Sequence, residues 1–432
     1  MASLQSGTIY LVLLCCSAAA ANVVVTSERD ISCTTPVNEP GICVYQYECV
    51  DGVISQSGEN IIDVRQLQDD CQDYMMVCCA EPIAVTTLPS VDDERKEEPI
   101  RSTTMSVTST TDAASAEGRT SSTTPRAVPK PKRPELKIPS YDVVGCGHRN
   151  PNGVIFSIQN NQLSESEYGE YPWSVAILSR DSPDEAPQYR CGGALIDRAA
   201  VLTTASCLYR YRFQVSSLVV RLGEWDMSTV AEPLPHVDAD VEKIHLHPQF
   251  QESSKINDIA IIVLRETIEL NHTIGVVCLP PATIDIGVQD VVGVGWGDVP
   301  KFVEKAPQTI LKKSHLRSIV YETCQSNLRK LMGRQYRLDR GFLCAQANDL
   351  EMLPCTGDTG SPYVSEVVPG QERYHLVGLV SWGYHCNKQT FPTVLTNVAR
   401  YRGWVDEVIR SEGLDERSYV YEEEEPASSE EE

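Results

Sequence analysis

The cysteines of this chain fall into two groups, and their spacing limits the possible folds more than any other feature. Of the sixteen, six lie within residues 33–79 and eight follow residue 145. A segment as short as the first group spans cannot bury enough apolar surface to offset its chain entropy, so it predicts a small module held by disulfides. Even numbers in both groups also favour disulfides over metal thiolates.

The two remaining cysteines, Cys15 and Cys16, lie in an N-terminal segment without charged side chains. An apolar run from Ile9 leads there into a stretch of small residues before Asn22. This pattern predicts a cleaved secretory signal peptide over residues 1–21, and with it a secreted, extracellular protein. The run is too short to cross a bilayer, so a membrane anchor is the weaker alternative.

Residues 80–140 have the composition of a linker. Between Ser102 and Thr124, fourteen of 23 residues are Ser or Thr, with no apolar period. Such a tract cannot form a core and predicts a disordered connection. Its exposed basic residues are candidate cleavage sites for a trypsin-like enzyme: Arg101, Arg119, Arg126 and Lys132.

The chain is strongly acidic, with a formal net charge of −23. Phosphates of nucleic acids and anionic lipid headgroups would repel it, so neither is an expected partner. Basic partners are favoured instead. Glutamates gather at the end of the chain, and residues 412–432 are predicted to form an acidic, solubilising tail.

Residues 146–411 are predicted to form an all-β domain. Short β-branched runs alternate there with turn residues, as they do in sandwiches and barrels. The runs are Trp173–Leu178, Ser217–Leu222, Ile259–Leu264, Asp290–Val294 and His375–Val380.

Three short stretches of this domain carry its chemistry. They read Leu202-Thr203-Thr204-Ala205-Ser206-Cys207, Asn257-Asp258-Ile259-Ala260 and Gly357-Asp358-Thr359-Gly360-Ser361-Pro362. In this order they resemble the base, acid and nucleophile motifs of chymotrypsin-like serine proteases. Ser206 stands where that family has histidine and Thr359 where it has serine, while Asp258 keeps the acid. The resemblance implies a chymotrypsin-like double β-barrel, two six-stranded barrels with a degenerate triad between them.

The resemblance also implies that the domain is not a catalyst. A threonine hydroxyl is a poor nucleophile until a base takes its proton, and the base is gone. Around residues 156–160 there is no basic residue and no glycine pair, so we do not expect the family's activation cleavage, which frees an ammonium for the acid Asp358. No motif places His245, His247 or His385, and we interpret them as ordinary surface or turn histidines.

The substrate pocket is predicted to differ as well. Leu353 stands where trypsin-like enzymes carry an aspartate that pairs with a substrate Arg or Lys. Ser381-Trp382-Gly383 resembles the substrate-binding strand, but Thr393 takes the position of a glycine on the opposite wall. An uncharged and narrowed pocket is therefore expected.

The first cysteine group ends in the adjacent pair Cys78-Cys79, and residues 33–79 resemble the clip domain of arthropod extracellular proteases. The sequence alone leaves many connectivities open. The resemblance implies the pairs Cys33 with Cys78, Cys43 with Cys71, and Cys49 with Cys79. In the protease-like domain it implies Cys146 with Cys278, Cys191 with Cys207, Cys324 with Cys344, and Cys355 with Cys386.

Two local patterns concern ligands and modification. Glu224, Asp226 and Glu232 lie where some chymotrypsin-like enzymes have a calcium loop, and carboxylate oxygens suit that ion. A solvated acidic loop is the preferred interpretation, so no metal or other cofactor is expected. Asn271-His272-Thr273 is an N-glycosylation acceptor sequence, which agrees with a secreted protein.

Together these features resemble non-catalytic clip-domain serine protease homologues. The resemblance implies a secreted haemolymph protein that acts as a cofactor or regulator in an extracellular proteolytic cascade of innate immunity, notably prophenoloxidase activation and melanisation. Its expected partners are other clip-domain proteases, prophenoloxidase or complement-like proteins. The alternatives are an extracellular matrix or adhesion protein and a weakly active serine-type endopeptidase.

Overall fold

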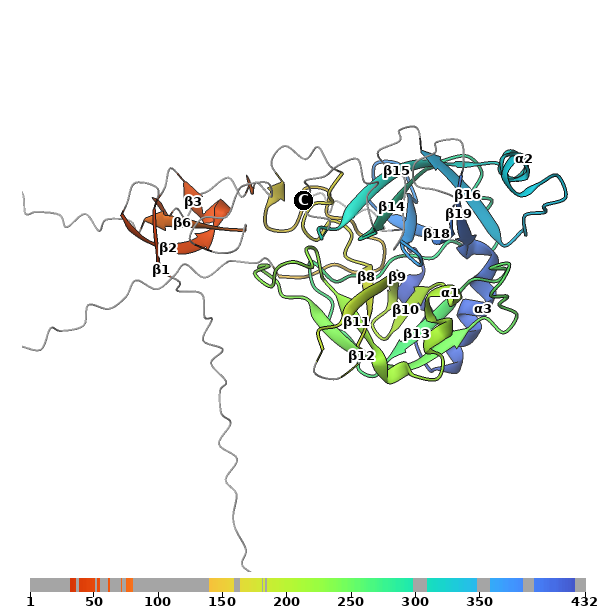
Figure 1. Cartoon of the computed structure of the whole chain (residues 1–432), viewed down its shortest axis with the longest axis horizontal. Coiled ribbons are helices and arrows are strands. Elements are labelled where there is room, and N and C mark those ends of the chain that lie inside the picture. Colours follow the sequence, from red (N-terminus) through yellow and green to blue (C-terminus); the bar gives the residue numbers. More distant parts are fainter. Residues whose placement is uncertain are drawn as a thin grey trace, which may run out of the picture.

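A computed structural model describes a small N-terminal sheet and, beyond it, two β-barrels (Figure 1). The described residues are 32–35, 39–50, 53–54, 61–62, 71, 75–80, 140–158, 164–180, 182, 185–297, 309–347, 358–383 and 392–423. The predicted signal peptide and residues 81–139 of the linker, with its four candidate cleavage residues, lie outside these ranges. Within the described residues, no helix is both long and apolar enough to cross a membrane.

The N-terminal module is a five-stranded sheet with the strand order β1-β2-β6-β4-β3. The strands are β1 Ser32–Thr34, β2 Pro40–Tyr45, β3 Cys49–Val50, β4 Val53–Ile54 and β6 Met76–Ala80, with a 3₁₀ turn at Gln46–Glu48. Its buried residues are mainly half-cystines with Val44, Tyr45, Met75 and Met76. Disulfides therefore supply much of the core that so short a segment cannot supply with apolar side chains.

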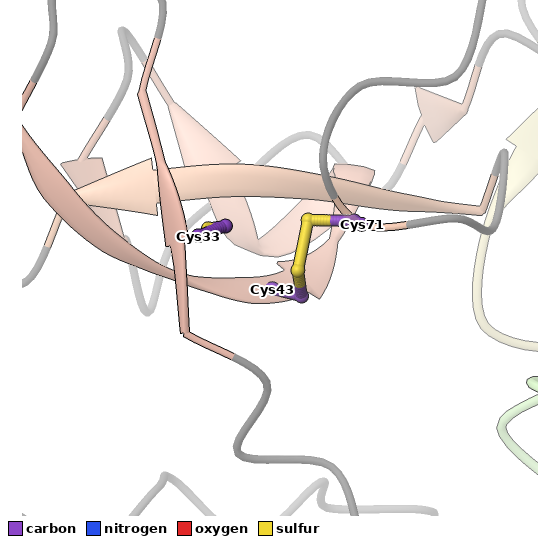
Figure 2. A group of neighbouring side chains, drawn as sticks. All are labelled: Cys33, Cys43 and Cys71. Carbon is purple, nitrogen blue, oxygen red and sulfur yellow. A yellow bond between two sulfur atoms is a disulfide. The ribbon is translucent and has the colours of Figure 1, made fainter.

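Six disulfides join described residues: Cys33 with Cys78, Cys43 with Cys71, Cys49 with Cys79, Cys146 with Cys278, Cys191 with Cys207, and Cys324 with Cys344. These are the pairs that the resemblance implied. The seventh expected pair, Cys355 with Cys386, lies outside the described residues. Figure 2 shows the bond between Cys43 and Cys71, with Cys33 beside it. The three sulfur atoms lie within 4.8 Å of one another, but each belongs to a disulfide and is no thiolate ligand for a metal.

The first barrel is closed, with the strand order β10-β13-β12-β11-β8-β9. Its strands are β8 Ser174–Ser179, β9 Gln188–Asp197, β10 Ala200–Thr203, β11 Leu218–Leu222, β12 Val237–Leu246 and β13 Ala260–Leu264. Every residue of β13 is buried, as a continuous apolar run predicts. In β12, Ala239 and Val241 face inward while Asp238 and Asp240 face outward, the alternation of a half-exposed strand.

The second barrel repeats the architecture, with the order β14-β15-β16-β19-β18-β17. Its strands are β14 Asp290–Gly295, β15 Lys312–Ile319, β16 Phe342–Ala347, β17 Pro362–Glu366, β18 Tyr374–Trp382 and β19 Thr393–Asn397. The five strands predicted from sequence all occur, each within two residues of its expected ends. The fold is thus the expected chymotrypsin-like double barrel.

The N-terminal module contacts the barrels through a short strand. β5, Ile61–Ile62, pairs in parallel with β7, Ser157–Ile158, which precedes the first barrel in the chain. Buried residues of both parts also belong to one hydrophobic cluster, among them Tyr45, Met75 and Phe156. The N-terminal module therefore packs against the barrel domain in addition to being joined to it by the linker.

Two helices and the end of the chain differ from the sequence-based picture. α2, Tyr321–Met332, and α3, Val398–Ser411, were not predicted. The acidic tail predicted from residue 412 is wrong in its first half, because residues 412–423 pack against the barrels. Tyr419 is fully buried, and its carbonyl accepts a hydrogen bond from the N–H of Leu279 at 2.8 Å.

Candidate functional site

The degenerate centre lies where elements of both barrels meet. Ser206 lies in the short helix α1, Ala205–Leu208, directly after β10, and Asp258 lies just before β13. Ser381 lies near the end of β18 in the second barrel, and Thr359 lies in the turn that leads into β17. The fold therefore brings Ser206 and Ser381 to Asp258 from one barrel each, and the assignment of Ser206, Asp258 and Thr359 to triad positions stays a prediction.

Asp258 is fully buried, and its carboxylate accepts three hydrogen bonds. Ser206 donates twice, from its backbone N–H to Oδ1 at 2.6 Å and from its hydroxyl to Oδ2 at 2.8 Å. The hydroxyl of Ser381 donates to Oδ2 at 2.5 Å. Burial raises the pKa of Asp258, and the hydrogen bonds from Ser381 and Ser206 oppose that rise. The acid is thus satisfied by hydroxyls and an amide, and within the described residues no histidine hydrogen-bonds it.

Thr359 is half-buried beside this network. Its backbone carbonyl accepts a hydrogen bond from the N–H of Gly192 at 2.9 Å, whereas its hydroxyl makes none within the described residues. A serine at position 206 has one proton, and that proton is directed at Asp258. Within the part of the chain that the structure describes, no basic side chain hydrogen-bonds Thr359 to take its proton. Gly357, the first residue of the nucleophile motif, lies outside the described residues.

The carboxylate of Asp358 has a backbone hydrogen-bond partner. Its Oδ1 accepts a hydrogen bond from the N–H of Gly297 at 2.9 Å. A Cβ at Gly297 would lie 2.3 Å from the carboxyl carbon of Asp358, so only glycine fits there. Burial, and then the charge of Asp358, raise the pKa of Tyr189. Asp358 is therefore buried with a backbone hydrogen bond, and the lack of an activation cleavage stays a prediction.

The pocket residues are only partly described. Ser381 hydrogen-bonds Asp258, and Trp382 packs edge-to-face on Phe342 with ring centroids 6.3 Å apart. Thr393 is buried at the start of β19, opposite Ala345 of β16. Leu353 and the segment 384–391 lie outside the described residues, so the narrowed and uncharged pocket stays a prediction.

The described histidines occupy other places. His245 lies 2.9 Å from Glu412 Oε1, and the ring of His247 contacts the rings of Tyr401 and Trp404. His385 lies outside the described residues. The structure thus offers no described histidine as a replacement base for Thr359.

Comparisons with known proteins agree with this geometry. The trypsin family matches residues 160–405, more than half of the chain, and the family described as "Serine protease Clip domain PPAF-2" matches residues 30–80. Inactive CLIP domain-containing serine protease A28 of Anopheles gambiae is 32% identical over 94% of this chain and 98% of its own length. The chain belongs to the clip-domain serine protease homologues.

Two further relatives extend the comparison. Phenoloxidase-activating factor 2 of Galleria mellonella is 36% identical to this homologue over 287 residues, 64% of this chain and 93% of that protein. Inactive CLIP domain-containing serine protease A8 of Anopheles gambiae is 28% identical over 85% of this chain and 88% of its own length. Relatives named inactive support a non-catalytic status for this homologue.

The acidic stretch of the homologue is buried, so the expected solvated loop is wrong. Glu224, Asp226 and Glu232 are at most 5% exposed. Glu232 Oε1 accepts hydrogen bonds from the N–H groups of Trp225 and Asp226, at 3.0 and 2.9 Å. Burial, and then the charge of Glu224, raise the pKa of Glu232. Protonation of Glu232 is thus favoured next to Glu224.

The same residues do not fit calcium, which takes six to eight oxygen ligands. Ligand atoms of Glu224, Glu232 and His236 lie within 4.8 Å of one another, but Glu224 Oε2 already lies 3.2 Å from Arg221 and 3.1 Å from His236. Asp226 instead accepts hydrogen bonds from the N–H and hydroxyl of Ser228, both at 2.9 Å. In this homologue Arg221 offsets part of the negative charge of Glu224.

Asn271 is half-buried, which bears on its modification. Its Oδ1 accepts hydrogen bonds from Thr273 N, Thr273 Oγ1 and Ile274 N at 2.8, 2.9 and 3.0 Å. These bonds fix the side chain in a turn. Glycosylation at this acceptor sequence stays a prediction.

Proposed function

We propose that this clip-domain serine protease homologue is a secreted, non-catalytic regulator of an extracellular proteolytic cascade that leads to phenoloxidase activation. The observation that carries the proposal is the donor set of Asp258, namely Ser206, Ser381 and an amide where a base would stand. Without a base, the chain acts by what it binds. The likeness to phenoloxidase-activating factor 2 supports the choice of cascade.

The partners that fit this role are other proteins of the same cascade: clip-domain proteases, prophenoloxidase and complement-like proteins. Haemolymph is the compartment in which they would meet. The disulfides of both parts support an oxidising, extracellular location. The degenerate cleft between the barrels, with its loops, is the proposed partner-binding face, because loops of this fold already shape a channel for extended peptide.

Cleavage of the linker is the proposed switch. The pairing of β5 with β7 supports a docked state in which the clip domain covers part of the protease-like domain. A flexible tether holds a docked module at an effective concentration near millimolar, by the general estimate for such linkers. An upstream protease that cuts after Arg101, Arg119, Arg126 or Lys132 would abolish this high effective concentration. The clip domain would then dissociate and uncover the surface of the protease-like domain on which it was docked.

A reconstitution with purified prophenoloxidase and its activating protease tests both parts. Phenoloxidase activity should be the same with the wild type and with Thr359→Ala, because the homologue contributes no hydrolysis. Replacing Arg101, Arg119, Arg126 and Lys132 together by Gln should prevent cleavage of the linker. It should also prevent the homologue from promoting phenoloxidase activation. The matched control is Lys130→Gln with Arg133→Gln, since proline follows both residues and already blocks trypsin-like cleavage. An uncut variant that supports activation as well as the wild type would contradict the switch.

A further inference from the structure

A basic surface lies on the second barrel, around the end of α2. Residues 329–340 carry five Arg or Lys side chains and one Asp, in a chain whose net charge is −23. All five basic side chains are exposed, and with exposed Arg400 of α3 we call them the basic surface: Arg329, Lys330, Arg334, Arg337, Arg340 and Arg400. A concentration of positive charge on so acidic a chain creates a local field that attracts anionic groups.

No carboxylate neutralises the basic surface within the described residues. Arg329 donates to the carbonyl of Tyr336 at 3.0 Å, and Lys330 donates to Asn327 Oδ1 at 3.1 Å. The one acidic side chain of the segment, Asp339, accepts a hydrogen bond from the N–H of Gly341. Elsewhere many basic residues are paired, for example Arg149 and Lys313 with Glu170, and Arg221 with Asp238.

A cavity of about 470 Å³ opens beside the basic surface, between α2, β15 and the start of α3. Arg340 and Arg400 line it together with the apolar side chains of Ile284, Ile286, Ile319, Val320 and Phe342. Ile284 and Val320 are 40% and 45% exposed, so part of this apolar lining faces solvent. Asp285 and Glu322 also line the cavity, and Asp285 Oδ1 accepts a hydrogen bond from the N–H of Gly287.

Arg340 is pre-oriented at the rim of the cavity. Its guanidinium carbon lies 3.7 Å from the ring centroid of Tyr321. Stacking on an aromatic ring uses the face of the guanidinium and leaves its N–H edge free to donate to a planar acceptor such as a carboxylate. Arg residues held in this way are typical of protein interfaces.

We propose that the basic surface and this cavity bind an extended acidic peptide segment of a partner protein, with an apolar or aromatic residue among its carboxylates. The apolar lining would receive that side chain, and Arg334, Arg337 and Arg340 would pair with the carboxylates on either side. A sulfated polysaccharide could use the charges, but it has no apolar side chain for the cavity. The site does not involve the degenerate cleft, so a negative binding result would not contradict the proposed function.

A direct binding measurement tests the proposal. The probe is a fluorescein-labelled peptide with the sequence of residues 419–432, which combines two tyrosines with seven glutamates. Fluorescence anisotropy is measured with the full chain and with a chain ending at Glu423, so that the chain's own acidic end cannot hide the site. Binding should weaken by about tenfold or more when Arg334, Arg337 and Arg340 are together replaced by Gln, and it should weaken with added salt.

The matched control is Arg210→Gln with Arg212→Gln, since both residues are exposed and make no ion pair within the described residues. This control should bind as the wild type does. A peptide whose tyrosines are changed to serine should bind several-fold more weakly if the cavity receives an apolar side chain. The proposal is overturned if the peptide binds neither chain, if the Tyr-to-Ser peptide binds equally well, or if a heparin oligosaccharide binds this surface in preference to the peptide.

Discussion

Ser206 donates its hydroxyl proton to Asp258 Oδ2 over 2.8 Å, while its own N–H donates to Oδ1 of the same carboxylate over 2.6 Å. A histidine in this place would present one ring nitrogen to the acid and a second to the nucleophile. The serine has no second group to present. The carboxylate is thus retained as a structural element that holds α1 against β13.

The first prediction concerns repair of the centre. Thr359→Ser alone should leave the chain unable to hydrolyse peptide esters, because no base is restored; in subtilisin, loss of the base costs on the order of 10⁶ in turnover. Ser206→His with Thr359→Ser is the minimum repair. Labelling by a fluorophosphonate probe measures the outcome, and labelling of the wild type at Thr359 would falsify the assignment as a pseudo-protease.

The second prediction concerns stability at Asp258. Ser206→Ala removes one donor from a buried carboxylate and should lower the free energy of unfolding by about 1–3 kcal/mol. Ser254→Ala is the control, since Ser254 is exposed and its hydroxyl bonds only to Gln251 and, at 3.4 Å, to the N–H of Ile256 within the described residues; its effect should stay within about 0.5 kcal/mol. Denaturant unfolding measures both. Equal effects would mean that the Ser206 hydrogen bond contributes nothing to the fold.

The third prediction concerns the attachment of the clip domain. Phe156 is 2% exposed and stacks on Tyr168, with ring centroids 5.0 Å apart, directly before β7. Phe156→Ala should cost about 3–5 kcal/mol locally and speed hydrogen exchange in β5 and β7. The control Phe213→Ala changes a side chain that is 85% exposed and should do neither. Unchanged exchange in β5 after Phe156→Ala would show that the docking does not depend on this cluster.

The fourth prediction concerns pH. Burial and Glu224 raise the pKa of Glu232 from 4.5 to about 9, so the folded state binds this proton more tightly than the unfolded state. Its contribution to stability is complete below about pH 4.5 and is lost as the pH rises toward 9.

Glu232→Gln mimics the protonated acid and should remove that loss. The variant should gain about 4 kcal/mol over the wild type at about pH 8 relative to the difference at about pH 5, since each pH unit between the two pKa values costs the wild type about 1.4 kcal/mol. Thermal unfolding at both pH values measures the gain. Exposed Glu252→Gln should show no such difference, and a Glu232→Gln effect independent of pH would refute the assignment of the proton.

The fifth prediction concerns fragments after processing. Cys146 and Cys278 form a disulfide that lies wholly on the C-terminal side of the linker. A cut in the linker should therefore separate the clip and protease-like parts on a denaturing gel without reductant. A cut between Cys146 and Pro172 would leave them joined, so one band without reductant and two with it would locate the cleavage there.

The architecture was predictable because its signals are local. Alternating β-branched runs and turn residues gave strands such as β11 and β13 within one residue. The helix α3 was missed, although Val398, Tyr401, Val405 and Val408 recur at helical spacing and are all buried. That helical period is present in the sequence and is sufficient to predict α3.

Other features depend on the tertiary fold and leave no trace in the sequence. β5 and β7 have two residues each and are far apart along the chain, so no sequence pattern predicts that they pair. Acidic residues are usually exposed, so the sequence alone predicts that Glu224 and Glu232 face solvent. Only the fold brings Arg221 and His236 to Glu224. Likewise, Ser381 was placed in the pocket strand, but its bond to Asp258 joins two barrels.

The burial of Tyr419 decides where the chain can be shortened. Beyond α3, Ser418 donates to Asp197 Oδ2 at 2.6 Å, and the guanidinium of Arg402 lies 4.8 Å from the centre of the Tyr419 ring. A recombinant protein that stops at Ser411 would uncover the N–H of Leu279 and apolar surface on the first barrel. Affinity tags should therefore be attached after Glu423, and truncations for crystallisation should remove only residues beyond it. The acidic composition alone would suggest removing everything after α3.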